Sequence, residues 1–166
     1  EIKASKGAPA DSNKAFKSAW KDFSKGKIAK AIEGAEKVGA KKPELAAEAT
    51  AVVEEFEARI QSRLDAISWS IDNGYAFEAK GELKDLLKSL KGADGMYTSA
   101  QEIEQRFTEE GMELELEASE VLGKALAKLF EDGREEKLFD KVEKLSDKYA
   151  GTKVAARARK VVAMRP

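Results

Sequence analysis

Apolar residues recur along this chain at intervals of three and four positions, which is the period of an α-helix. The pattern runs from Phe16 to Val162 and is interrupted by turns that contain glycine. No segment shows the strict alternation of apolar and polar residues that a half-buried strand requires. The sequence therefore predicts an all-α fold of about seven helices, for which circular dichroism should detect no sheet.

The predicted helices form three antiparallel hairpins followed by a C-terminal capping helix. The third helix is the longest, at roughly 30 residues or about 45 Å, and Pro43 suits its first turn because a proline there loses no hydrogen bond. The fifth contains Gly111, which marks a kink or a break. The apolar stripes that define the helices span residues 16–23, 28–38, 45–71, 75–90, 103–130, 138–149 and 154–162.

The chain opens on a stretch of different composition. Residues 1–13 are rich in alanine, serine, lysine and glycine, and Pro9 disfavours a helix there. The sequence therefore predicts a flexible N-terminal tether over 1–13 and a single all-helical domain over 14–166. The first residue is Glu1 rather than methionine, which favours a periplasmic or secreted chain that has lost a leader; a trimmed segment of a longer protein explains it equally well.

Three turns share one pattern, in which a glycine follows an aromatic or aliphatic residue by three positions and precedes an alanine or leucine by five. These glycines are Gly26, Gly74 and Gly133. Residues 15–32 have the order Ala-Phe-x-x-Ala-Trp-x-x-Phe-x-x-Gly-x-x-x-x-Ala-Ile. This order resembles the helix–turn–helix of a tetratricopeptide repeat, and the resemblance is best over Ala15–Val38. The segments 97–100 and 149–152 are similar to the junctions between such repeats in bacterial proteins. The glycines lie 48 and 59 positions apart, against about 34 in a regular array, so the resemblance implies an irregular one.

The resemblance also implies a binding face, because the first helix of each such repeat lines an inner groove. Carried onto the matching segment, it places Asn13, Phe16, Trp20 and Phe23 on that face, where nearby lysines suit a protein or peptide with acidic flanks. The corresponding stripe of the third helix carries Gln61, Leu64, Ser68 and Ile71. The alternative is that the aromatic residues are simply core.

Composition excludes several kinds of chemistry. The chain has no cysteine and no histidine, and zinc sites, copper sites, thiol catalysis and histidine base catalysis depend on those residues. The acidic run 109–117 spreads over several faces of a helix, which is typical of a solvated surface. The sequence predicts no catalytic residue, no metal site and no cofactor, so we expect the protein not to be an enzyme.

Charge is segregated along the chain although the formal net charge is only −1. Residues 1–43 carry 11 lysines and 5 acids, whereas residues 101–120 carry 1 basic residue and 8 acids. The C-terminal part is basic, which suits the C-terminal ends of helices or contact with the acidic middle of the chain. No aromatic residue is interleaved with this basic part, which disfavours nucleic acid. No apolar run approaches the ~20 residues that span a membrane.

These observations lead to two functional hypotheses. The first is a non-enzymatic helical-repeat scaffold that binds a protein or a peptide. The second is a structural helical bundle without a ligand groove, either an accessory segment of a larger polypeptide or a homo-oligomer. An exposed, concave aromatic stripe favours the first hypothesis, and a fully buried stripe with a broad apolar outer patch favours the second.

Overall fold

The computed structural model describes residues 9, 12–131 and 136–165 of the chain. The all-α prediction is confirmed, since the described residues form helices and turns and contain no strand. The described part of the chain contains eight α-helices and three short 3-10 helices in this order: η1 (Lys14–Phe16), α1 (Lys17–Ser24), α2 (Ile28–Lys41), η2 (Pro43–Leu45), α3 (Ala46–Asp72), α4 (Ala76–Ser89), α5 (Asp94–Gln105), η3 (Arg106–Thr108), α6 (Met112–Glu131), α7 (Glu136–Lys148) and α8 (Lys153–Val162).

The number of helices differs from the prediction because the predicted fifth helix is two helices, α5 and α6. Gly111 stands between them with a φ of +82°, a left-handed conformation that glycine adopts without a steric penalty. Glu109, just before it, has extended backbone angles that end η3. Of the two outcomes that the sequence allowed at Gly111, a kink or a break, the structure has the break.

The long third helix is present as α3, which has 27 residues and a length of about 40 Å. Pro43 is the first residue of η2, directly before it. Both positions agree with the expectation that proline marks the entry to this helix.

The helices pack into two compact units. Among the described residues, unit 1 comprises those up to position 65 together with 84–102, and unit 2 comprises 66–83 together with those from position 103 onwards. The boundary passes through α3, α4 and α5, so each of these helices contributes to both units. That residues 14–166 fold as one domain stays a prediction, and most of the predicted tether lies outside the described residues.

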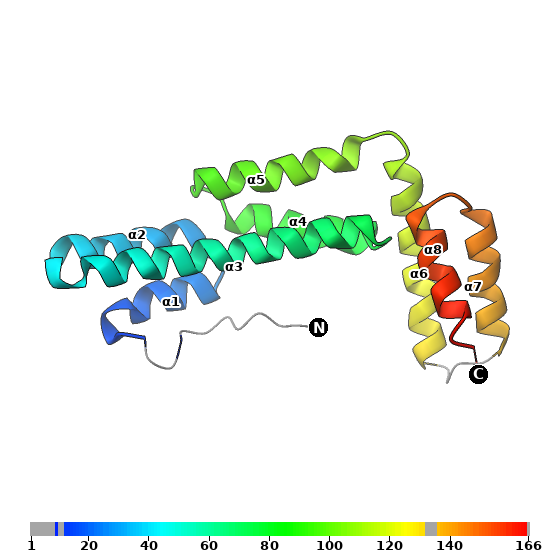
Figure 1. Ribbon diagram of the computed structural model, residues 1–166, viewed down its shortest axis with the longest axis horizontal. Helices are drawn as coiled ribbons and strands as arrows, with labels where there is room; N and C mark the ends of the chain where they lie inside the picture. The colour runs from blue at the N-terminus through cyan, green and yellow to red at the C-terminus, as the bar shows by residue number, and fades with distance from the viewer. Residues whose placement is uncertain (1–8, 10–11, 132–135, 166) are drawn as a thin grey trace. The chain divides into compact units, whose positions relative to one another are not determined.

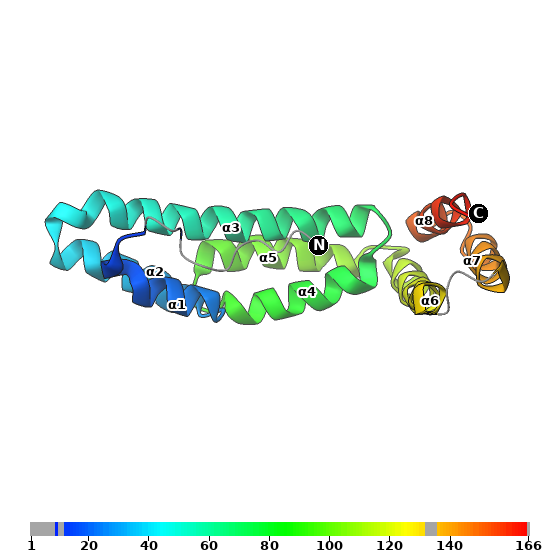
Figure 2. The same cartoon turned by 90° about the horizontal axis from the view of Figure 1, so that it is seen from below.

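Unit 1 contains α1, α2 and the N-terminal part of α3, with α2 lying along α3 in both views (Figures 1 and 2). Its core joins the aromatic side chains of the N-terminal segment to small residues of α2 and α3. The buried members of this core are Phe16, Ala19, Trp20, Ala31, Ala35, Ala49, Val52 and Phe56.

Unit 2 contains α6, α7 and α8, which pack side by side (Figures 1 and 2). Thr152 caps the start of α8, because its hydroxyl accepts a hydrogen bond from the backbone N–H of Ala155. The turn at Gly133 lies outside the described residues. The buried core of unit 2 consists of Ala118, Leu122, Ala125, Leu126, Leu129, Phe139, Val142, Tyr149, Val154 and Ala158.

Candidate functional site

Asn13, the first residue of the predicted binding face, caps the start of the helical segment. Its Oδ1 atom accepts a hydrogen bond of 3.0 Å from the backbone N–H of Ala15, and its Nδ2 atom donates one of 3.1 Å to Glu48 Oε2 on α3. The side chain thereby ties the N-terminal segment to α3 within unit 1.

The three aromatic residues of that face pack against α3. Phe16 is fully buried and Trp20 is 4 % exposed, while Phe23 is half-buried. The rings of Phe23 and Phe56 stack with centroids 4.4 Å apart, and Trp20 meets Phe56 edge to face at 4.7 Å. The guanidinium carbon of Arg59 lies 4.9 Å from the Trp20 ring centroid. The structure thus brings these residues together as the core of unit 1, and their role in partner binding stays a prediction.

Two residues of the stripe expected on the third helix are buried, and the other two make polar contacts. Leu64 and Ile71 are each 1 % exposed, so they also belong to the interior. Gln61 is exposed and donates to Asp65, and Ser68 accepts a hydrogen bond from Arg106 in unit 2. Neither stripe leaves an apolar row open to solvent.

An open groove does run along α2 and α3 in unit 1. It consists of two hollows of about 740 and 400 Å³ that share Glu36 as a lining residue, and we call it the α2–α3 groove. Both helices present one face to it, since the lining positions recur at helical spacing. From α2 these are Ala29, Lys30, Ile32, Glu33, Glu36, Gly39 and Ala40; from α3 they are Ala46, Ala49, Thr50, Val53 and Glu57; and residues 92–96 before and within α5 close one end.

The floor of the α2–α3 groove is apolar and built from small residues. A Cβ added at Gly39 would lie 2.8 Å from Ala49 Cβ, which shows how closely the two helices approach. At the other end, a Cβ at Gly92 would lie 3.3 Å from Ala29 Cβ, so the turn before α5 rests directly on α2. Small side chains at this contact let α2 and α3 pack closely, because the distance between packed helix axes depends on the side chains at the contact.

The rim of the α2–α3 groove is acidic. Glu33, Glu36, Glu57 and Asp94 are exposed there, and Lys30 is the one basic residue among the groove's lining residues. Hydrogen bonding and charge attraction from Lys37 lower the pKa of the Glu33 carboxyl below its usual value, so this group stays ionised at neutral pH.

Sequence reasoning missed this groove because its residues carry no local signature. Alanine and glutamate are the commonest residues of any solvated helix, and the lining positions come from three separate segments of the chain. The available signal was the face of α2 on which Ala29, Ile32, Glu36 and Ala40 recur.

In unit 2, the turn between α3 and α4 packs against the start of α8. Gly74 has a φ of +79°, and a Cβ there would lie 2.9 Å from the backbone oxygen of Lys153 and 3.0 Å from Val154 Cα. Only glycine fits this contact, since both the backbone angle and the space exclude a side chain. The close contact of this turn is therefore with the backbone of α8.

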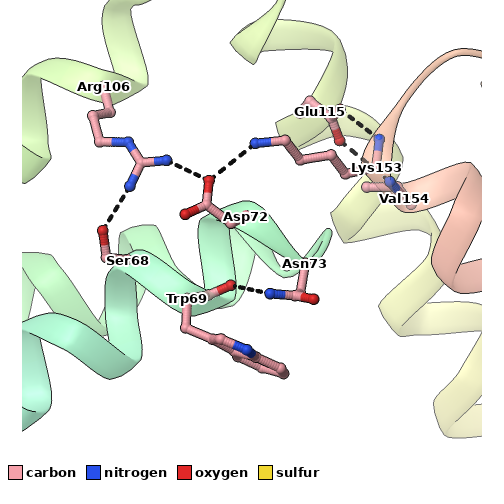
Figure 3. Close-up of polar contacts among 8 residues, drawn as sticks. All are labelled: Ser68, Trp69, Asp72, Asn73, Arg106, Glu115, Lys153 and Val154. Carbon is pink, nitrogen blue, oxygen red and sulfur yellow. Dashed lines mark hydrogen bonds and ion pairs between the residues drawn. The ribbon is translucent and has the colours of Figure 1, made fainter.

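Asp72 is the centre of the polar contacts around that turn (Figure 3). Its Oδ1 atom accepts hydrogen bonds from Arg106 Nη2 at 2.6 Å and from Lys153 Nζ at 3.1 Å. The carboxylate of Glu115 on α6 accepts from the backbone N–H groups of Lys153 and Val154 at 2.7 and 3.3 Å, satisfying the first donors of α8. These contacts join α3, η3, α6 and α8 within unit 2.

The pKa of Asp72 predicts how pH affects unit 2. Partial burial raises the pKa of this carboxyl, but hydrogen bonds from Arg106 and Lys153 outweigh burial and lower it overall. A carboxyl with a lowered pKa stabilises the fold above its unfolded pKa of about 3.9, and the contribution is lost as pH falls through the folded value. We expect Asp72→Asn to cost about 0.5–1 kcal/mol at pH 7, because the group is half exposed, and to cost progressively less below pH ~4.

Urea unfolding at pH 7 and pH 3 measures this difference. The control is Asp147→Asn, since the Asp147 carboxylate is exposed and makes no hydrogen bond or ion pair with the rest of the described chain. Equal losses for both variants at both pH values would show that the Asp72 contacts do not stabilise unit 2.

The basic residues near the C-terminus contact acidic residues of unit 2. Arg157 lies 3.5 Å from Glu78 and donates to the Gly74 carbonyl at 3.1 Å. The same guanidinium covers the Tyr75 ring, which stacks on Trp69. Trp69 is 59 % exposed and points away from Asp72 (Figure 3). Part of the basic C-terminal segment is therefore used within the fold, as the segregated charges suggested.

The described residues offer no group of three or more carboxylates placed to hold a metal ion, and none of their helices is long and apolar enough to cross a membrane. Comparison with known proteins gives no match to any protein family, any curated protein or any solved structure. We therefore infer a function from the α2–α3 groove and from the chain's own chemistry.

Proposed function

We propose that this protein is a non-enzymatic helical scaffold that binds a helical segment of a partner protein in the α2–α3 groove. The observation that supports the proposal most strongly is the apolar floor shared by two helices and open to solvent. An exposed apolar surface rimmed by polar residues is typical of an interaction site.

The dimensions of the groove suit a helical ligand. The α2 positions that line it extend from Ala29 to Ala40, which corresponds to about 16 Å or three turns of helix. A helix of that length would offer anchors at positions i, i+3, i+4 and i+7, as in other helix-in-groove complexes. We further propose that α1 and α2 form a tetratricopeptide-like hairpin, one of the irregular hairpins expected along the chain.

A blocking substitution tests this proposal. The probes are three fluorescein-labelled 18-residue designed helices that share one stripe of leucine and alanine and carry lysine, glutamine or glutamate on the flanks. We expect at least one probe to bind the full chain by fluorescence polarisation. Ala40→Phe should weaken that binding about tenfold or more, because the new ring occupies the floor of the groove.

The matched control is Ala51→Phe, which places the same ring at an exposed alanine of α3 that does not line the groove. It should leave binding unchanged, and both variants should retain the melting temperature of the parent within a few degrees. Failure of all three probes to bind, or equal binding to Ala40→Phe and the parent, would contradict the proposal and favour a structural bundle without a groove.

A further inference from the structure

We propose that the segment bound in the α2–α3 groove is cationic, an amphipathic helix whose lysine or arginine residues meet the carboxylates at the α5 end of the groove. This inference rests on the proposed function. It specifies the charge of the bound segment and the orientation of that segment along the groove.

The first argument is the balance of charge around the groove. Four carboxylates face one ammonium group among the lining residues, and Lys30 already lies 3.7 Å from Asp22 Oδ2. Glu33 pairs with Lys37. Glu36 and Glu57 are exposed and make no ion pair or hydrogen bond with any other described residue. These two carboxylates are available to a ligand, and complementary charge steers encounter and selects the partner.

The second argument is that the charges are unevenly distributed along the groove. Glu33, Glu57 and Asp94 line only the hollow next to α5, and Glu36 marks the junction of the two hollows. The far hollow is otherwise lined by Gly39, Ala40, Ala46, Ala49, Thr50 and Val53, which carry no charge. The partial positive charge at the start of α5 is offset by Asp94 in its first turn. A ligand would therefore place its cationic end near α5 and small apolar residues over the far hollow.

A charge-reversal experiment with the same lysine, glutamine and glutamate probes tests this inference. The lysine probe should bind the full chain about tenfold or more tightly than the glutamate probe, and its binding should weaken between 0.05 and 0.5 M NaCl as salt screens the exposed charges. In Glu36→Lys/Glu57→Lys the affinity for the lysine probe should fall about tenfold and the affinity for the glutamate probe should rise.

The control is Glu44→Lys/Glu54→Lys, which changes the net charge of unit 1 equally at exposed positions outside the groove. It should change each affinity by less than about threefold, because distant exposed charges are screened. Equal binding of all three probes, with no effect of reversal at Glu36 and Glu57, would overturn the cationic partner and leave the groove proposal standing. Equal effects of the two double variants would also overturn it, and failure of every probe to bind would overturn both proposals.

Discussion

Trp20→Ala should lower the free energy of unfolding of unit 1 by about 3–5 kcal/mol. Trp20 is 4 % exposed and packs edge to face against Phe23 and Phe56, with centroid separations of 6.1 and 4.7 Å. Removing the indole leaves a large cavity among neighbours that belong to three different elements. Such a site collapses only in part, so the loss of stability should be near the upper end for a core residue.

Two further variants make this prediction specific. Trp20→Phe keeps an aromatic ring and removes the indole N–H, which is buried without a hydrogen-bond partner in the described part of the chain; it should cost less than half as much as Trp20→Ala. In a Trp69→Phe background, iodide should barely quench Trp20 fluorescence. A small change in the melting temperature of Trp20→Ala, together with a readily quenched Trp20, would instead indicate that the aromatic stripe is exposed and available as a binding face.

Gly74→Ala should destabilise unit 2 by about 2–4 kcal/mol. An L-residue held in the left-handed conformation costs roughly 1–2 kcal/mol, and here the new Cβ would also meet the backbone of Lys153 and Val154 at 2.9–3.0 Å. Backbone atoms cannot rotate away as a flexible side chain can, so α8 must shift from the turn. Denaturant unfolding followed by Trp69 fluorescence in a Trp20→Phe background reports this loss, because Trp69 lies in unit 2.

Gly111→Ala is the matched control for this substitution. Gly111 has nearly the same backbone angle, with a φ of +82°, but a Cβ there would meet nothing within 4 Å. Its replacement should cost only the conformational penalty of about 1–2 kcal/mol. Equal losses at the two glycines would show that the contact between the α3–α4 turn and α8 contributes nothing to stability.

Much of the fold follows from local patterns in the sequence. The three-and-four spacing of apolar residues identifies the helices because each helix must bury one face. The ends of helices at Gly74, Gly111 and Thr152 have local causes. The two glycines adopt a positive φ, and the Thr152 hydroxyl caps α8. The apolar period predicts one helix in place of α5 and α6, with a kink or a break at Gly111. This is because the period continues on both sides of that glycine, which is the one interruption in the pattern.

The candidate site could not be found in this way. The spacing of an apolar stripe predicts that the stripe is buried, but it does not identify the element against which the stripe packs. Phe16, Trp20 and Phe23 meet Phe56 of α3, which lies more than 30 positions further along the chain. The α2–α3 groove is likewise created by packing, from alanines and glutamates whose local sequence is ordinary for a helix. Because its rim is acidic, we propose a cationic partner for the groove, whereas the lysines near residues 13–23 led us to expect a segment with acidic flanks.

Amide chemical-shift mapping of the lysine probe on the isotope-labelled full chain tests the central proposal most directly. We expect the largest shifts at residues that line the α2–α3 groove, such as Ala29, Glu36, Val53 and Met96, with little change in unit 2. The largest shifts around residues 13–23 or Trp69, with the groove amides unmoved, would contradict the proposal.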